Sequence, residues 1–317
     1  MNTGMNQLCA GIDIGGTSVK FGLFTPDGNL IQKWSIPTRT EANGCHILED
    51  IACSLKETLH GLGLSLKNLT GAGMGIPGLV LPGGYVEICA NLGWKSLNPQ
   101  EILSGLLDGL PVRCENDANV AALGEVWQGG GRKYQDMVMI TLGTGIGGGV
   151  ILGGKIRSGK EGLCGELGHI HIIEEETESC GCGGIGCLEQ AASATGIVRT
   201  ANRLLNASNR PSLLRGKETV TAKDVIDAAK AGDAISTEAL DRGCRYLGWV
   251  MSAVTMTIEP EAYVIGGGLS AAGTFLTDKI RHYHEAFTPL IREKIPVLLA
   301  ELGNDAGIYG AARLILI

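Results

Sequence analysis

Apolar runs and amphipathic stretches alternate along this chain, which is the pattern of a protein built from both strands and helices. Short runs rich in β-branched and aliphatic residues predict strands or buried segments at 8–14, 19–24, 71–80, 110–115, 136–156 (two strands), 261–270 and 297–302. Apolar residues three and four positions apart predict helices at 43–61, 118–128, 192–206, 221–231, 235–258, 273–294 and 306–316. The stretch 157–190 is rich in loops, and its acidic run "EEETE" is typical of a solvated loop.

Two of these segments share one motif, which consists of a strand, a short glycine-rich turn and a second strand. The first is "LCAGIDIGGTSVKFGLF" at 8–24 and the second lies within 136–156. Glycines leave backbone N–H groups accessible, and such groups can bind a phosphate. The first stretch by itself is equally compatible with a plain turn that binds nothing. The second glycine-rich turn matches the dinucleotide-binding fingerprint from Gly143 to Gly148. That fingerprint must stand at the start of a helix, whereas an apolar strand follows it here. We therefore expect two phosphate-binding hairpins that face each other across a cleft.

Composition and charge narrow the class of protein. Hydrophobic residues make up 44% of the 317 residues and charged residues 19%, which is enough apolar material for two domains. The net charge of −7 disfavours nucleic acid and anionic membranes as partners. The apolar run 247–258 is too short to span a membrane, and "MNTGMNQ" does not resemble a signal peptide. We expect a cytoplasmic protein whose ten cysteines are mostly thiols, with any cluster of them serving metal binding or catalysis.

Five motifs resemble one known family. "DIGGT" (13–17), "END" (115–117), "TLGTGIGGG" (141–149), "ELGH" (166–169) and "CGCGGIGCLE" (180–189) occur in this order. Together they resemble the ROK family of sugar kinases and repressors, and within it the bacterial ATP-dependent glucokinases. The resemblance implies an actin/hexokinase-like (ribonuclease H-like) α/β fold with an interdomain cleft, and a homodimer. Only about a dozen residues precede Asp13, which favours the kinase branch over the repressor branch with its winged helix.

The sugar-binding and catalytic residues follow from the same motifs. A carboxylate can accept the proton of a sugar hydroxyl during phosphoryl transfer, and the resemblance makes Asp117 this base. Taken alone, Asp117 ahead of "ANVAALGE" would be a helix N-cap, and the two roles are compatible. The resemblance implies that the sugar hydroxyls are bound by polar side chains at Asn91, Asn116, Asp117, Glu166, His169 and Glu189.

The cysteine cluster predicts a structural zinc site. Cys180, Cys182 and Cys187 form C-x-C-x4-C among glycines, and three thiolates with one imidazole make a closed tetrahedral site. We expect His169 to be the fourth ligand, with its other ring nitrogen facing the sugar.

On the nucleotide side, ATP is expected to bind with Mg²⁺. Asp13 is the candidate magnesium carboxylate, and Thr17 the candidate donor to phosphate. The backbone turns expected around the nucleotide lie at Gly15, Gly16, Thr144, Gly145, Gly267 and Gly268.

The expected domains are 1–115 with 306–317, and 116–305 with the zinc-binding loop. The expected function is ATP-dependent phosphorylation of the 6-hydroxyl of glucose, which would place the protein in glycolysis and carbohydrate metabolism. A kinase for another hexose or amino sugar (N-acetylglucosamine, N-acetylmannosamine or fructose) is the first alternative. A non-catalytic sugar sensor is the second.

Overall fold

The computed structural model describes residues 7–317 and divides them into two units, each organised around strands. The first unit comprises the chain to Gln135 together with Gly149–Gly165 and Glu301–Ile317, and the second comprises Asp136–Gly148 and Glu166–Ala300. Residues 116–135 and 149–165 thus pack with the N-terminal part of the chain. Residues 1–6, which include most of the stretch considered for a signal peptide, lie outside the described residues.

A mixed five-stranded sheet forms the centre of the first unit. Its order is β3-β2-β1-β4-β7, with β1, β4 and β7 parallel and the hairpin β1-β2-β3 antiparallel. Asp13, Gly75 and Glu115 occupy one row across the three parallel strands, near their carboxyl ends. The strands are β1 (Leu8–Ile14), β2 (Ser18–Phe24), β3 (Leu30–Pro37), β4 (Leu69–Ile76) and β7 (Val112–Asn116).

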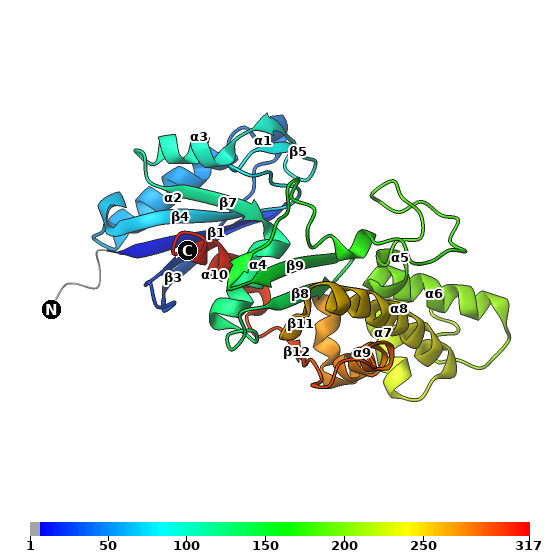
Figure 1. Ribbon diagram of the computed structural model, residues 1–317. Helices are drawn as coiled ribbons and strands as arrows, with labels where there is room; N and C mark the ends of the chain where they lie inside the picture. The colour runs from blue at the N-terminus through cyan, green and yellow to red at the C-terminus, as the bar shows by residue number, and fades with distance from the viewer. Residues whose placement is uncertain (1–6) are drawn as a thin grey trace. The chain divides into compact units, whose positions relative to one another are not determined.

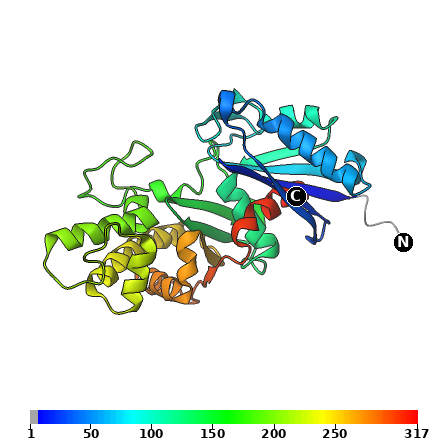
Figure 2. The same cartoon turned by 180° about the vertical axis from the view of Figure 1, so that it is seen from behind.

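Helices cover both faces of this sheet (Figures 1 and 2). On one face, α2 (Ile47–Gly61) buries its apolar stripe in the main core of the unit, beside α3 (Pro99–Leu106). On the other face, α10 (Ala306–Arg313) packs on β1, β2 and β4 and against α4 (Asp117–Gln128). The minor elements are the short helix α1 (Glu41–Gly44), a 3₁₀ turn (Leu66–Asn68), the hairpin of β5 (Val86–Cys89) with β6 (Trp94–Leu97), and a 3₁₀ turn (Gly303–Asp305).

Glycines allow α10 to approach its neighbours at backbone distance. A Cβ added at Gly73 would lie 1.7 Å from the carbonyl oxygen of Ala311, and one added at Gly11 would lie 1.9 Å from that of Ile308. The contact is reciprocal on the helix side, where a Cβ at Gly310 would lie 1.6 Å from the carbonyl oxygen of Val120. Only residues without a side chain fit at these positions.

The second sheet has the order β10-β9-β8-β11-β12, and β11 pairs in parallel with both β8 and β12. Its strands are β8 (Met137–Leu142), β9 (Ile146–Leu152), β10 (Lys155–Ile156), β11 (Ala262–Gly266) and β12 (Val297–Leu299). The 25-residue α8 packs against four helices of the second unit, α5, α6, α7 and α9. The helices of this unit are α5 (Glu189–Ala192), α6 (Ala194–Ala207), α7 (Ala222–Lys230), α8 (Ala234–Ile258) and α9 (Thr274–Phe287), with 3₁₀ turns at Leu167–His169 and Gly268–Ala272.

The predicted elements recur in the structure, with three differences that have physical reasons. The helix expected over 43–61 begins at Ile47, because Ala42 and Asn43 adopt left-handed backbone angles that interrupt it. The helix expected over 273–294 ends at Phe287, because the residue before Pro289 disfavours helical angles. The edge strand β3, the β5–β6 hairpin and α3 were not predicted; β3 is largely exposed and so lacks an apolar signature.

No helix within residues 7–317 is long and apolar enough to cross a membrane.

Candidate active site and metal centre

The first glycine turn links β1 to β2 and is held by backbone bonds. The amide N–H of Gly15 donates to the carbonyl of Ser18 (3.0 Å), and the hydroxyl of Thr38 donates to the carbonyl of Gly15 (2.7 Å). Gly16 and Thr17 are exposed, and a Cβ placed on Gly16 would meet no described atom within 4 Å. The turn therefore presents accessible backbone at the end of β1, as expected for a phosphate-binding turn.

Asp13 lies on β1 just before this turn, directly opposite Lys20 on β2. The Lys20 ammonium lies 3.5 Å from Asp13 Oδ2 and donates to the carbonyl of Asn304 (3.2 Å). Asp13 also packs against Gly307 near the start of α10, where a Cβ would lie 2.7 Å from the Asp13 carboxyl carbon. Burial raises the pKa of Asp13, and the Lys20 charge opposes that shift. Lys20 was not predicted as a site residue, although the cross-strand register of a tight hairpin would have paired it with Asp13.

Asn116 and Asp117 lie where β7 passes into α4, and the structure corrects which of them caps the helix. The side-chain oxygen of Asn116 accepts from the backbone N–H groups of Ala118 (2.9 Å) and Asn119 (3.1 Å). Asn116 is thus the N-cap, whereas Asp117 alone had been considered for that role; Asn116 also donates to the carbonyl of Gly78 (2.9 Å). Asp117 is the first helical residue, and its Oδ1 accepts from the amide of Ala118 (2.8 Å). Capping by Asn116 leaves the carboxylate of Asp117 to be oriented by the helix start.

The strand geometry brings Asp13 and Asp117 to the same edge of the sheet. A Cβ on Gly75, in the strand between them, would lie 3.8 Å from Asp13 Oδ1 and 3.7 Å from the Cα of Asp117. Ligands of open α/β sheets bind beyond the carboxyl ends of parallel strands, and this edge is such a place.

Asn91 is exposed in the loop between β5 and β6. The nearby thiol of Cys89 donates to the carbonyl of Pro77 (2.7 Å), which anchors this hairpin. Burial raises the pKa of Cys89, and the charge of Asp117 raises it further. The hairpin that carries Asn91 therefore lies within electrostatic range of Asp117.

The second glycine turn, Gly143 to Gly145, joins β8 to β9. The amide of Gly143 donates to the carbonyl of Gly145 (2.9 Å), and the Thr195 hydroxyl donates to the carbonyl of Thr144 (2.8 Å). A strand follows the turn, as predicted from the residues after Gly148, so the dinucleotide reading of this motif is excluded. Thr195, at the start of α6, was not predicted to support this turn.

Gly267 and Gly268 follow β11, which pairs with β8, so their turn lies beside the second glycine turn. Gly267 has a φ of 79°, and a Cβ there would lie 2.5 Å from the carbonyl oxygen of Leu142. Glycine is required at this position by both its backbone angle and its close approach to β8.

Glu189 connects the second turn to the cysteine cluster. Its Oε2 accepts from the amide of Ile146 (2.8 Å), and its Oε1 lies 3.8 Å from the sulfur of Cys180. A Cβ on Gly145 would lie 2.3 Å from Glu189 Oε2, so only glycine allows this contact. Glu189 therefore supports the turn, in addition to the sugar contact expected from its sequence.

The proposed metal ligands come together in the second unit. One donor atom from each of His169, Cys180, Cys182 and Cys187 lies within 4.8 Å of the others. His169 Nδ1 is 3.7 Å from Cys180 Sγ, and the sulfurs of Cys182 and Cys187 are 3.6 Å apart with no disulfide. Tetrahedral zinc with Zn–S bonds of about 2.3 Å places its ligand atoms about 3.7 Å apart, so the four donors fit zinc.

The same histidine faces Glu166 with its other nitrogen. Nε2 of His169 lies 4.0 Å from Glu166 Oε2, and both side chains are about one-third exposed, at 34% and 38%. Nδ1 is thus the nitrogen directed at the cysteines, and Nε2 is directed at an exposed carboxylate.

A buried ion-pair network holds the cysteine loop against α6. The Glu176 carboxylate, 2% exposed, accepts from Arg199 (2.6 Å) and from Arg203 (3.1 Å). These arginines lower the pKa of Glu176 to about 2, with the hydrogen bond from Arg203 as the largest cause. Gln190 completes the attachment, since its Oε1 accepts from the amide of Cys187 (3.0 Å) and its Nε2 donates to the carbonyl of Glu178 (2.9 Å). The prediction that the acidic run 174–178 is a solvated loop is wrong for Glu176, because two arginines from α6 surround it.

Comparison with known proteins then identifies the family, because residues 9–316 match the ROK family. The chain belongs to the ROK family. This ROK protein is 39% identical over 310 residues to the glucokinase of Halalkalibacterium halodurans, covering 96% of this chain and 94% of the relative. It is 34% identical to the ROK family glucokinase from Streptomyces griseus solved in complex with glucose and AMPPNP, with a TM-score of 0.74 over 97% of this chain and 98% of that one. The ROK hexokinase from Thermus thermophilus gives a TM-score of 0.82 at 29% identity, covering 96% of each chain. The expected actin/hexokinase-like α/β fold is confirmed.

Within each unit of this ROK protein, the structure brings together the predicted residues. Asp13, the first glycine turn, Asn116 and Asp117 share one sheet edge in the first unit. Thr144, Gly145, Glu189, His169 and the three cysteines form a connected set in the second unit.

Proposed function

We infer that this protein is a glucokinase that transfers the γ-phosphoryl group of ATP to the 6-hydroxyl of glucose. The observation that carries this inference is the near-complete match to glucokinases, one of them solved with glucose and an ATP analogue. The ATP-dependent reaction needs a proton acceptor, phosphate-binding backbone and discrimination between sugars. The chain has candidate residues for each.

We assign the proton acceptor to Asp117. As the 6-oxygen of glucose forms its bond to the γ-phosphorus, the bond from that phosphorus to the bridging oxygen of ADP breaks. The hydroxyl proton passes to the Asp117 carboxylate, whose position is set by the Asn116 cap and the start of α4. A proton acceptor of this kind typically contributes about 10²–10⁴ in rate.

We assign the phosphate contacts to backbone rather than to side chains. The first turn offers the N–H of Gly16, since that of Gly15 donates to Ser18, and the turns at Thr144–Gly145 and Gly267–Gly268 offer further N–H groups. Thr17 adds a hydroxyl. Magnesium bound on the Asp13 side would neutralise charge on the transferring group, and Lys20 orients the Asp13 carboxylate.

We assign sugar recognition to Asn91, Asn116, Glu166, His169 and Glu189. Buried or oriented polar groups reject a sugar whose hydroxyls are misplaced, because they are then left without partners. Zinc held by His169, Cys180, Cys182 and Cys187 would fix the ring orientation of His169 and leave Nε2 to bind the sugar beside Glu166.

A coupled kinase assay over a panel of hexoses, with ATP and magnesium, tests this function. We expect kcat/KM for glucose to exceed that for fructose, N-acetylglucosamine and N-acetylmannosamine by at least tenfold. A higher kcat/KM for an amino sugar than for glucose would show that the amino sugar is the substrate. Sugar binding without turnover of any hexose would instead indicate a sensor.

A further inference from the structure

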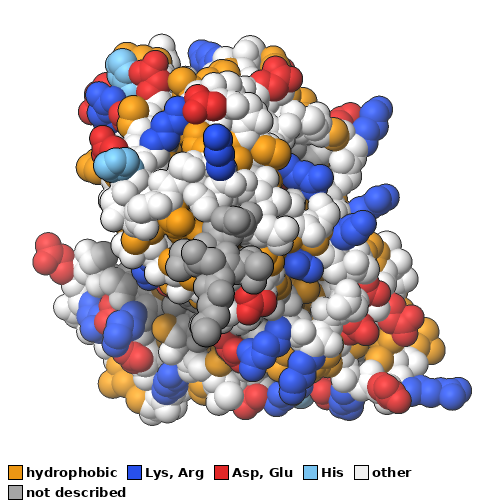
Figure 3. Space-filling model, turned by 90° about the vertical axis from the view of Figure 1, so that its left-hand side faces the viewer, with side chains coloured by type: hydrophobic (Ala, Val, Ile, Leu, Met, Phe, Trp, Pro, Cys, Tyr) orange, Lys and Arg blue, Asp and Glu red, His pale blue; other side chains and the backbone are white. Residues whose placement is uncertain are grey.

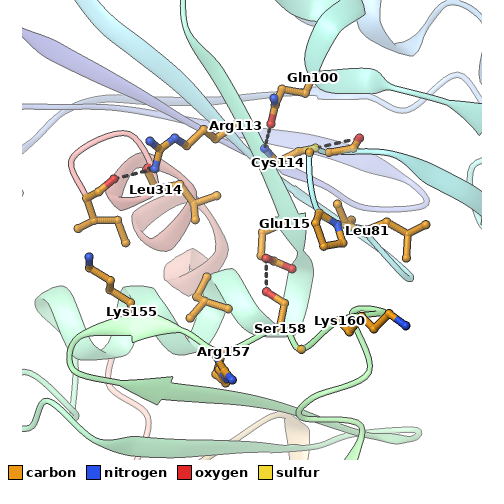
Figure 4. A pocket seen from close by; sticks show the side chains of 17 residues that line it. Leu81, Gln100, Arg113, Cys114, Glu115, Lys155, Arg157, Ser158, Lys160 and Leu314 are labelled. Carbon is orange, nitrogen blue, oxygen red and sulfur yellow. Dashed lines mark hydrogen bonds between the residues drawn. The ribbon is translucent and has the colours of Figure 1, made fainter.

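A cavity of about 880 Å³ lies in the first unit, and the residues assigned to catalysis do not line it. Its walls are β7, the segment from β10 to Lys160, the loop Val80–Gly84 and the end of the chain after α10 (Figure 4). None of the residues predicted for nucleotide, sugar or metal binding lines it. The cavity is therefore a separate site.

The cavity is basic in a protein that is acidic overall. Arg113, Lys155, Arg157 and Lys160 line it, and among residues 7–317 Glu115 is its one acidic side chain. None of these four cations forms an ion pair with an acidic side chain in that range. The net charge of the chain is −7, and on the face shown in Figure 3 basic and acidic side chains intermingle. Unpaired cations around one cavity therefore mark a site for an anion.

The single acid in the cavity is already satisfied by the protein. Glu115 Oε2 accepts from the Ser158 hydroxyl (2.6 Å), and its Oε1 accepts from the amide of Asn116 (2.9 Å) and the side chain of Asn119 (3.2 Å). Figure 4 shows the Ser158–Glu115 pair at the centre of the cavity. Three neutral donors satisfy the oxygens of Glu115 without removing its charge, and within residues 7–317 it forms no ion pair with the cations around it.

The cations differ in how they are placed. Arg113 is held by the carbonyls of Leu314 (3.2 Å) and Ile317 (2.6 Å). Lys155 lies on the same side of the cavity as Arg113, Arg157 lies on the wall opposite β7, and the ammonium of Lys160 points outward at the rim (Figure 4). Besides the fixed guanidinium of Arg113, the cavity thus has Lys155 and Arg157 on its walls as cations for an anion.

We propose that this cavity binds a phosphate monoester of a small polyhydroxylated molecule at a site distinct from the catalytic centre. Lysine and arginine match a phosphate dianion, and the Ser158 hydroxyl and Gln100 amide suit the hydroxyl groups of its carbon skeleton. The volume lies in the range of small-molecule sites, about 300–1,000 Å³.

The site is coupled to turnover through Glu115. This residue immediately precedes Asn116 and Asp117, and it binds both the amide of Asn116 and the hydroxyl of Ser158. An ester that engages Ser158 changes the hydrogen bonding of Glu115 and so the placement of the Asp117 carboxylate. This coupling rests on the proposed function, whereas binding in the cavity does not.

Isothermal titration calorimetry of the full chain with glucose 6-phosphate and with inorganic phosphate tests the binding. Saturating glucose is present throughout, so that the catalytic sugar site is occupied. We expect glucose 6-phosphate to bind more tightly than inorganic phosphate and to lose at least tenfold in affinity in Lys155→Ala/Arg157→Ala. The charge-matched control Lys67→Ala/Lys133→Ala should stay within twofold of the unsubstituted protein, and both double variants should keep its glucose KM.

Equal affinity of the two double variants for glucose 6-phosphate would overturn the proposed site. So would binding of inorganic phosphate as tight as that of the ester, or no binding of the ester at millimolar concentration in the presence of glucose. An inactive protein that still binds the ester in this manner would refute the kinase assignment and support the site.

Ser158→Ala tests the coupling. We expect the variant to bind glucose 6-phosphate within threefold of the unsubstituted protein, while the ester no longer changes its kcat. An ester effect on kcat that persists in Ser158→Ala would overturn the coupling through Glu115.

Discussion

Asp13 shows how a functional residue opposes stability. Its carboxylate is packed between Lys20 and Gly307, and burial raises its pKa from the ordinary value of 3.8. The folded protein therefore binds more protons than the unfolded chain above pH 3.8, and this group lowers stability as the pH rises through that window. The charge is retained, on our assignment, because magnesium and nucleotide need it.

Asp13→Asn is accordingly expected to raise the Tm at pH 7.5 in buffer free of nucleotide and magnesium. The difference from the unsubstituted protein should shrink as the pH falls through the raised pKa of the native Asp13 carboxyl, because that carboxyl then becomes protonated too. Calorimetry at several pH values measures this, and kinase activity should fall in the same variant. A lower Tm at pH 7.5 would mean that the contact with Lys20 outweighs the burial of the charge.

Asp117→Asn should retain glucose binding and lose about 10²–10⁴ in kcat, because the amide keeps the hydrogen bond from Ala118 but cannot accept a proton. Steady-state kinetics and glucose titration separate the two effects. Asp108→Asn is the matched control, since Asp108 is exposed with a φ of 58°, a conformation that asparagine tolerates. Turnover of Asp117→Asn within a few-fold of the control would rule out Asp117 as the base.

At the scale of elements, the cysteine loop depends on α6 for its attachment. Arg199 and Arg203 bind Glu176, and Gln190 ties the loop backbone at Cys187 and Glu178. The pKa of Glu176, lowered to about 2, means that its stabilising contribution is present above pH 4.5 and is lost as the pH falls toward 2. The three cysteine ligands on this glycine-rich loop are thereby positioned before any metal binds.

We expect the purified protein to contain about one zinc per chain, and Glu176→Gln to release it about tenfold faster to a chelator. The glucose KM should rise as His169 loses its orientation, with little change in the KM for ATP. Glu174→Gln, an exposed change in the same acidic run, is the control. Elemental analysis without zinc, or equal release from both variants, would contradict the role of the network.

At the scale of the whole molecule, the end of the chain completes the first unit. Helix α10 packs on strands from residues 8–24 and 69–76 and against α4, and glycines on both sides allow backbone contact. Such packing joins the two ends of the sequence in one core, so stability of this unit requires residues some 300 positions apart.

Gly73→Ala is expected to destabilise the protein by about 1–3 kcal/mol or more, because its methyl group would meet the backbone of Ala311. Urea unfolding should show a lower midpoint with an unchanged slope. Gly105→Ala, in α3 with no described atom within 4 Å of the new methyl group, should be neutral or stabilising by about 0.4–1 kcal/mol. Equal midpoints for the two variants would show that α10 does not pack as described.

The sequence by itself determined the order of strands and helices, the two glycine turns and the cysteine cluster. Each depends on local chemistry: apolar periodicity, glycine in tight turns, and the spacing of thiols. The exclusion of a dinucleotide motif at Gly143–Gly148 also came from the local pattern, since a β-branched run follows it. The β3 edge strand escaped detection because an exposed strand has no apolar face to reveal it.

Only the tertiary structure decided the roles that depend on neighbours distant in sequence. The N-cap of α4 is Asn116 and not the predicted Asp117, because Asn116 is the last residue of β7 and keeps extended backbone angles. Glu176 became a buried anchor because α6 places two arginines beside it, and Glu115 and Ser158 met because the segment after β10 returns to β7. The sequence specifies which side chains carry charge, but whether a charge is exposed, paired or buried depends on which elements the fold places around it.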